Sequence, residues 1–285
     1  MPESAPRVVL SRFQAADLLR ARERGDERVL TSADLGLSTS DVALTEEGAR
    51  FPDGELLLWE DVDEIADREN ACFRLDDAGI HEIRVFSEHT NWVRALMPTR
   101  GAPTMLVSGI PMHRILGIDP RQDTLRKMRA VAPVNGVVLD TATGLGYTAI
   151  EAARTAERVI TIELDPAGLE IARQNPWSRE LFDNPRIQQI VGDACDEVEQ
   201  FADGTFSRII HDPPALSLAG ELYSGAFYRQ LFRVLRRNGR LFHYIGDPAS
   251  ASGRNTTSGV IRRLKESGFT RVERRPEAFG VVAGR

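Results

Sequence analysis

From residue 137 onward the sequence alternates regularly between short apolar runs and longer amphipathic segments. The apolar runs predict strands over residues 137–141, 159–163, 186–191, 207–212 and 240–245. The segments between them predict helices over residues 148–154, 166–174, 194–201, 223–236 and 256–266, the last with Asn255 as N-cap. Two further strands, 270–274 and 279–283, follow with no helix between them. The pattern predicts an α/β fold: a doubly wound, mostly parallel seven-stranded sheet of Rossmann-like type, with one antiparallel edge strand.

The first of these strands runs into an unusual turn. The apolar run ends on Asp140 and passes through small residues that include Gly144 and Gly146, and a helix begins at Thr148. A strand, a tight turn and a helix N-terminus bring backbone N–H groups against a nucleotide-like ligand. In open parallel sheets, ligands bind outside the carboxyl ends of the strands. We therefore predict a ligand site at this turn.

Acidic residues stand at the carboxyl ends of the first four predicted strands. Asp140, Glu163 and Asp212 end the first, second and fourth strands, and Asp193 follows the third. One acid at a strand end is most often a helix cap. Four acids at one edge of a sheet indicate a site instead.

The N-terminal part of the chain has a different pattern. Short runs rich in β-formers are separated by turn residues, which predicts strands near residues 42–45, 56–59, 72–75 and 80–86, with a strand and helix over 7–25 and a helix over 91–97. We predict a smaller β-rich N-terminal domain over residues 1–115 for substrate recognition, and a second domain over 116–285. Asp119 and Pro120 predict the start of a helix that runs to about residue 132. Between the domains, His113 and Arg114 are either linker residues or a lip that faces the substrate.

Composition excludes some classes of function. No apolar run approaches the roughly 20 residues that span a bilayer, and the N-terminus lacks a signal-peptide core. Cys72 and Cys195 have no metal-ligand spacing, so no metal is expected. The net charge of −6 argues weakly against nucleic acid, yet Lys127 and Lys265 are the only lysines. Arginine suits phosphate, although a GC-rich genome gives the same bias. We expect a cytoplasmic enzyme without a membrane partner.

Residues 137–285 resemble the class I S-adenosylmethionine-dependent methyltransferases, including the closing strand pair. The run from Asp140 through Trp177 to the His211-Asp212-Pro213-Pro214 motif is similar to a group of predicted archaeal methyltransferases. The resemblance implies S-adenosyl-L-methionine as cofactor and residues 116–285 as the domain that binds it. It places the glycine turn along the methionine part, with Asp140 near the amino group, Glu163 at the ribose and Asp193 at the adenine. The predicted cofactor-binding set is Asp140, Ala142, Gly144, Gly146, Glu163, Leu164, Asp193 and Ala194. Ala142 replaces the usual first glycine.

The motif at residues 211–214 resembles the Asp/Asn-Pro-Pro-aromatic motif of methyltransferases that act on conjugated amino nitrogens. Such a nitrogen is a poor nucleophile because its lone pair is delocalised. The carboxylate of Asp212 and the carbonyl of Pro213 can accept hydrogen bonds from the N–H groups of this nitrogen. The two prolines hold the turn rigid. The predicted catalytic set is His211, Asp212, Pro213 and Pro214. Ala215 stands where the family has an aromatic, so the stacking face would come from Trp177, Tyr223, Phe227 or Tyr228.

Several functions fit these residues. The first is N-methylation of an exocyclic amino group, cytosine N4 or adenine N6, in structured RNA, above all ribosomal RNA. Alternatives are methylation of a protein or small-molecule amine, an aminopropyl transferase of the spermidine-synthase type, and a non-catalytic scaffold. A nicotinamide enzyme lacks its third glycine here. A continuous basic face would favour RNA if it united the arginines at 121, 126, 129, 233, 236, 237, 262 and 263, and the RNA hypothesis loses its main support if they scatter.

Overall fold

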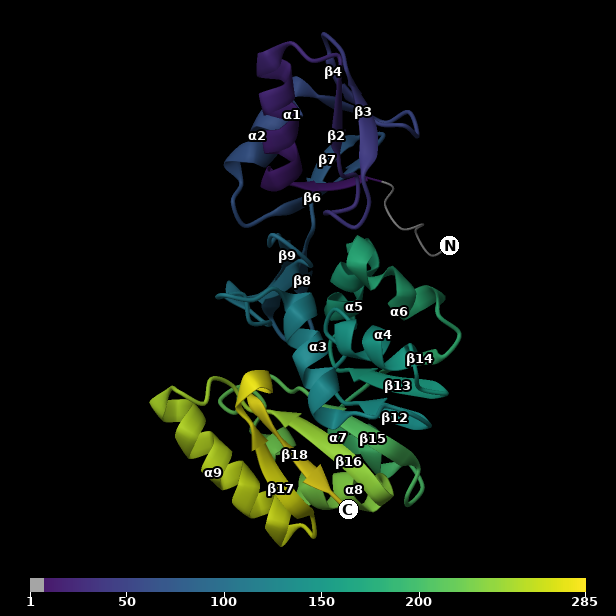
Figure 1. Ribbon diagram of the computed structural model, residues 1–285, viewed down its shortest axis with the longest axis vertical. Helices are drawn as coiled ribbons and strands as arrows, with labels where there is room; N and C mark the ends of the chain where they lie inside the picture. The colour runs from purple at the N-terminus through teal and green to yellow at the C-terminus, as the bar shows by residue number, and fades with distance from the viewer. Residues whose placement is uncertain (1–7) are drawn as a thin grey trace. The chain divides into compact units, whose positions relative to one another are not determined.

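The computed structural model describes residues 8–285, with the side chains of residues 251 and 252 left out (Figure 1). The start of the first predicted strand, at Arg7, lies outside the described residues. By its internal contacts the chain forms two compact units. One consists of residues 1–121 and 167–180, the other of residues 122–166 and 181–285. Within the described residues, no helix has both the length and the apolar character that crossing a membrane requires.

The first unit opens with the predicted strand and amphipathic helix. β1 (Val8–Ser11) leads into α1 (Arg12–Arg24). The side chain of Gln14 accepts a hydrogen bond from the N–H of Ser11 at 3.0 Å, which closes the first turn as a capping box. The helix ends at Gly25, whose φ of 73° is left-handed. The buried face of α1 packs into the core of this unit.

Short antiparallel strands form three small sheets in the first unit, which confirms its predicted β-rich character. They pair in the orders β1-β6-β7, β2-β3-β4-β5 and β11-β10-β9-β8. Their bounds are β2 (Arg28–Thr31), β3 (Ser40–Leu44), β4 (Gly48–Arg50), β5 (Leu56–Leu58), β6 (Cys72–Asp76), β7 (Gly79–Glu82), β8 (Arg84–Ser87), β9 (Trp92–Met97), β10 (Thr104–Val107) and β11 (Ile110–Pro111).

One local prediction in this unit is wrong, and one strand ends a residue earlier than predicted. The helix predicted over residues 91–97 is strand β9, because Asn91 adopts a left-handed turn and β8 and β10 pair with the strand on both sides. These pairings outweigh the weak helix preference of so short a segment. The strand predicted over 56–59 stops at Leu58, and α2 (Trp59–Asp67) begins there. Its buried residues Trp59, Val62 and Ile65 recur at helical spacing.

The second unit holds the predicted seven-stranded sheet, in the order β14-β13-β12-β15-β16-β18-β17. Its strands are β12 (Val137–Asp140), β13 (Arg158–Glu163), β14 (Ile187–Val191), β15 (Phe206–His211), β16 (Leu235–Tyr244), β17 (Thr270–Arg275) and β18 (Gly280–Gly284). The first five of these strands run parallel to one another. The predicted fold class is confirmed.

The place of the antiparallel strand differs from the prediction. β18 is antiparallel to both β16 and β17, so it lies between them, and the edge strand β17 is parallel to the rest. The sequence contains two adjacent strands at this point but no signal for their order in space. Apolar β18 takes the inner place because Val281 and Ala283 are fully buried, whereas β17 is mostly charged.

Helices cover both faces of this sheet. Side chains of α7 (Ala194–Glu199), α8 (Gly225–Val234) and α9 (Ala251–Glu266) form one core with Leu139, Leu241 and Val281. The other helices are α3 (Pro120–Val131), α4 (Tyr147–Ala153), α5 (Pro166–Gln174) and α6 (Arg179–Asp183), with 3-10 turns η1 (Pro176–Ser178), η2 (Gly220–Tyr223) and η3 (Pro276–Ala278). Of these, α5 and η1 belong to the first unit.

Three boundaries of helices and strands between residues 220 and 266 differ from the prediction. The N-cap of α9 is Ser250, which accepts from the N–H of Gly253, and not Asn255. The predicted helix over 223–236 is split into η2 and α8, and β16 begins directly at Leu235 because that residue pairs with Phe206 of β15. The polar residues that follow Leu235 conceal this strand in the sequence.

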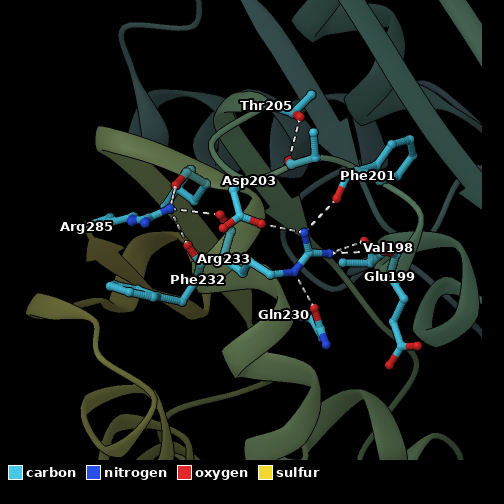
Figure 2. A network of polar contacts seen from close by, with 11 residues as sticks. Val198, Glu199, Phe201, Asp203, Thr205, Gln230, Phe232, Arg233 and Arg285 are labelled. Atoms are coloured by element: carbon cyan, nitrogen blue, oxygen red, sulfur yellow. Dashed lines mark hydrogen bonds and ion pairs between the residues drawn. The ribbon is translucent and has the colours of Figure 1, made fainter.

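Two arginines close the C-terminal ends of α7 and α8 (Figure 2). Arg233 donates to the carbonyl oxygens of Val198, Glu199 and Phe201 and also pairs with Asp203 at 2.8 Å. Arg285 donates to the carbonyl oxygens of Phe232 and Arg233 at 2.9 and 2.8 Å. Guanidinium groups at these ends satisfy carbonyls that have no partner within the helix. The Arg233 side chain therefore has a structural role.

Candidate active site

The strand order brings the four predicted acids to one edge of the sheet. β14, β13, β12 and β15 are adjacent and parallel, so Asp193, Glu163, Asp140 and Asp212 follow one another along their carboxyl ends. The prediction that these four strand ends form one rim agrees with this order. Their individual roles stay predictions. Among the described residues, no group of three or more His, Cys, Asp and Glu side chains is arranged to hold a metal ion.

The turn after β12 needs glycine at two positions. Gly144 and Gly146 have φ angles of 53° and 76°, in the left-handed region that other residues rarely adopt. A Cβ on Gly146 would lie 2.7 Å from a methyl group of Leu181. The backbone of Ala142 stays outside that region, which explains why alanine is tolerated where the family has glycine.

Glu163 ties this turn to the next strand. Its Oε2 accepts from the N–H of Gly144 at 2.8 Å, and its Oε1 accepts from the N–H of Asp165 at 3.1 Å. A carboxylate is an acceptor of the kind that the hydroxyl donors of a ribose require. Leu164 follows with an exposed apolar side chain. The role of Glu163 at the ribose stays a prediction.

Asp193 is a helix cap as well as a rim acid. Its Oδ1 accepts from the N–H of Cys195 at 2.7 Å and begins α7, and Ala194 is buried beside it. The cap accounts for one carboxylate oxygen. An adenine amino group would use the other.

Asp140 is fully buried and only half satisfied. Its Oδ2 accepts from the hydroxyls of Thr148 and Thr161 at 2.9 and 3.2 Å. Its Oδ1 is buried and has no hydrogen-bond partner among the described residues. Burial and the negative charge of Asp212 raise the pKa of Asp140 to about 7. An acceptor left unpaired in the interior fits the amino group of a ligand's methionine part.

Asp212 belongs to a buried ion cluster that the sequence analysis missed. Lys127 Nζ lies 2.5 Å from Oδ2 of Asp212, 2.9 Å from Oδ2 of Asp123 and 4.5 Å from the ring centre of Tyr244. The side chains of Lys127 and Asp123 are 3% and 0% exposed, whereas that of Asp212 is 18% exposed. Asp212 is therefore the member of this cluster that a substrate can reach.

Burial and the neighbouring charges act in opposite directions on the pKa values of this cluster. Burial raises the pKa of Asp212, and the Lys127 ammonium opposes that rise. Burial also works against the charge of Lys127, but the two carboxylates raise its pKa overall. The only signal in the sequence is the i,i+4 spacing of Asp123 and Lys127 on one helix. That spacing is common on exposed helix surfaces and does not show burial.

His211 is held on both sides by the protein. Nδ1 lies 2.7 Å from the hydroxyl of Thr141, and Nε2 lies 2.9 Å from the carbonyl of Leu222. The carbonyl requires a proton on Nε2, so Nδ1 accepts from Thr141. Burial lowers the pKa of His211 to about 4, so the ring is neutral. Of its two predicted roles, strand residue or substrate contact, this geometry favours the first.

A hydrogen bond from a buried tyrosine holds the Pro213-Pro214 turn in place. The hydroxyl of Tyr223 donates to the carbonyl of Pro214 at 3.0 Å. Tyr223, Phe227 and Tyr228 are buried in the core under α8. They are core residues rather than an exposed stacking face. Tyr228 also bonds Nε2 of His243 at 2.8 Å.

Two other predicted candidates lie in the first unit. Trp177 donates from Nε1 to the carbonyl of Leu35 at 3.1 Å. His113 follows β11, and its Nδ1 lies 3.0 Å from the hydroxyl of Thr104. Both side chains therefore have partners within their own unit.

Comparison with known proteins places this site in a family. A family profile described as a methyltransferase domain matches residues 138–239. An uncharacterized protein of Methanocaldococcus jannaschii, MJ1233, is 45% identical over 237 residues, which cover 82% of this chain and 80% of that protein.

Two further comparisons concern aminopropyl transfer. A polyamine aminopropyltransferase of Aeropyrum pernix is 27% identical over 133 residues, 45% of this chain and 40% of that enzyme. A crystal structure of spermidine synthase in complex with the transition state analogue AdoDATO superposes with a TM-score of 0.57 at 19% identity, over 74% of each chain. That likeness is one of fold. The chain itself belongs to the same family as the M. jannaschii protein, within the class I S-adenosylmethionine-dependent methyltransferases.

Proposed function

We propose that this methyltransferase acts on an amino nitrogen, held against Asp212. The observation that carries the proposal is the buried Asp123–Lys127–Asp212 cluster, which opens to solvent only through Asp212 and lies on the same sheet edge as Asp140. A carboxylate that is already held in place can accept hydrogen bonds from the N–H groups of an amine without moving itself.

Different residues of the chain would bind the cofactor and the acceptor. S-adenosylmethionine supplies an electrophilic methyl group on sulfonium, and Asp140, Glu163 and Asp193 would hold its amino, ribose and adenine groups. Asp212 would accept an N–H of the acceptor and take up the proton that the methylated nitrogen releases. The Lys127 ammonium opposes the rise in the pKa of Asp212 that burial causes. Tyr223 fixes the Pro-Pro turn that carries Asp212.

For the acceptor we propose an exocyclic amino group of a base in RNA. The eight arginines named from the sequence do not form one basic set. Arg233 binds carbonyl groups at the end of α7, and Arg262 pairs with Glu266 at 3.8 Å. Arg126 and Arg129 of α3, in contrast, line a surface depression. The RNA proposal therefore loses the continuous basic face that would have been its main support, and of the eight arginines it keeps these two.

Aminopropyl transfer is a second candidate, and the polyamine aminopropyltransferase relatives favour it. That reaction also ends on an amine, so the same Asp212 would serve it. The two reactions differ in the donor, since aminopropyl transfer uses decarboxylated S-adenosylmethionine. Against it, the residues after Asp212 are prolines and not a second acid.

The choice of donor and acceptor gives a direct test. We expect radiolabelled methyl to pass from S-adenosylmethionine to total RNA, at an amino nitrogen identified by nucleoside mass spectrometry. We expect no product from putrescine and decarboxylated S-adenosylmethionine. Methyl transfer to a protein or polyamine but not to RNA would contradict the choice of acceptor. Transfer from the decarboxylated donor alone would establish the second candidate instead.

The pKa of Asp140 predicts how cofactor binding depends on pH. The ionised carboxylate of Asp140 would accept a hydrogen bond from the cofactor's ammonium group. Because burial raises the pKa of Asp140 to about 7, cofactor binding below pH 7 requires the Asp140 carboxyl group to lose its proton. The dissociation constant for S-adenosylmethionine is expected to fall about tenfold per pH unit as pH rises toward 7, and to level off above it. Calorimetric titration from about pH 5 to 8 measures this slope. Asp140→Asn should bind weakly at every pH and with a flat profile. A flat profile for the native chain would contradict the assignment.

A further inference from the structure

Arginines gather on the face of the second unit's sheet that lies opposite to α8 and α9. Strand neighbours alternate between faces. Leu241 packs into the core under α8 and α9, so Arg240 lies on the opposite face, and Arg271 and Arg275 of β17 line the same depression as Arg240. Arg126 and Arg129 of α3 border the same surface.

These side chains line two adjoining depressions of about 620 and 500 Å³, which share Arg240 and Arg275. We call this surface the arginine groove and define it by Arg126, Arg129, Arg240, Arg271 and Arg275. It extends over β16, β18 and β17, and none of its five arginines belongs to the candidate active site.

Positive charge in the arginine groove exceeds negative charge. Its lining includes two acids, Glu273 and Glu277, and Glu273 pairs with Arg275 at 2.6 Å. Arg240 donates to the neutral carbonyl of Ala132. In a chain whose net charge is −6, five guanidinium groups at one surface need an explanation.

A buried arginine next to the groove also lies among uncompensated positive charges. Arg208 donates to the neutral carbonyls of Val131 and Ser207, at 3.2 and 2.6 Å. Burial lowers its pKa, and the nearby charges of Arg240 and Arg236 lower it further. The positive charges at this end of the groove thus repel one another, and an anion bound there would relieve that repulsion.

We propose that the arginine groove binds the phosphate backbone of the RNA substrate. This inference rests on the proposed function in naming RNA as the acceptor, but it concerns a different surface. Arginine forks suit phosphate oxygens. The extent of the groove over two depressions suits a chain of phosphates better than a single nucleotide.

The residues that line the groove argue against binding to a membrane surface. Its largest apolar lining side chain is Val282, and peripheral membrane contacts insert larger apolar side chains into the lipid. The groove has no aromatic lining on which bases would stack. Binding is therefore expected to depend on salt and hardly at all on sequence.

Fluorescence anisotropy with a labelled oligouridine of about 20 nucleotides, longer than common single-strand binding sites, tests the proposal. The variant R126Q/R129Q removes two charges from one wall of the groove. It is expected to raise the dissociation constant about tenfold at 0.1 M salt, and to lower the slope of log Kd against log salt by about 1.4. Glutamine suits a helix, so the fold should be kept.

The variant R229Q/R262Q is the matched control, because both residues are exposed on α8 and α9 and the charge change is the same. It should change the dissociation constant less than twofold. Equal losses in both variants, or no binding by the native chain, would overturn the proposal. So would binding to vesicles rich in phosphatidylserine but not to the oligouridine. Methyl transfer is measured separately, so RNA binding without methylation would count against the proposed function alone.

Discussion

Replacing Asp212 by alanine is expected to lower the turnover number for methyl transfer about 10³-fold, with the dissociation constant for S-adenosylmethionine changed less than about threefold. Asp212 is the one reachable member of a buried ion cluster, so its loss removes the acceptor for the amine and leaves the three acids proposed to hold the cofactor in place. Single-turnover methylation measures the first effect, and calorimetry measures the second.

A graded series strengthens this test. Asp212→Asn keeps a hydrogen-bond acceptor but not the charge, so it should retain more activity than the alanine variant. Asp183→Ala, an exposed acid at the end of α6, should leave activity unchanged. If Asp212→Ala lost cofactor binding together with activity, Asp212 would be a cofactor ligand. If it kept full activity, the proposed role would be wrong.

Replacing Lys127 by methionine is expected to have the largest effect on stability. The change leaves the Asp123 and Asp212 carboxylates in the interior without their shared cation. Removing one partner of a buried ion pair costs about 3–5 kcal/mol in the free energy of unfolding. Urea unfolding followed by circular dichroism measures this loss, with both units monitored because the chain has more than one compact part.

The chain offers its own control for this variant. Lys265 is the only other lysine and is exposed on α9, so Lys265→Met removes the same charge at the surface and should cost less than about 0.5 kcal/mol. The loss in Lys127→Met should shrink as pH falls, since burial already raises the pKa of Asp212 and protonation removes its charge. Equal stability of the two methionine variants would show that the cluster is not an energetic unit.

Much of the second unit could be predicted because its sequence repeats one simple pattern. Apolar runs that end on an acid mark the ends of β12, β13 and β15, and parallel pairing alone brings those acids together. The glycine turn could be predicted for the same reason, since Gly144 and Gly146 have a conformation that few other residues adopt.

Features that depend on distant partners could not be predicted in this way. Lys127 and Asp212 are 85 positions apart, so nothing local shows that they meet. The order of β17 and β18 depends on which strand fits beside β16, and β9 is a strand because β8 and β10 flank it. The buried aromatics under α8 show the same limit, because a tyrosine that stacks on a base and one that supports a turn look identical in sequence.

The order of the last two strands also bears on how the chain behaves at high concentration. β17 exposes the free edge of the sheet, where another chain could add a strand and begin to aggregate. Arg271 has a φ of 48°, and the pairing of β17 with β18 shifts its register between Thr270 and Glu273. This irregular edge, with charged side chains along most of its length, is a poor template for a further strand. The inner position of β18 thus keeps the more apolar of the two strands away from neighbouring molecules.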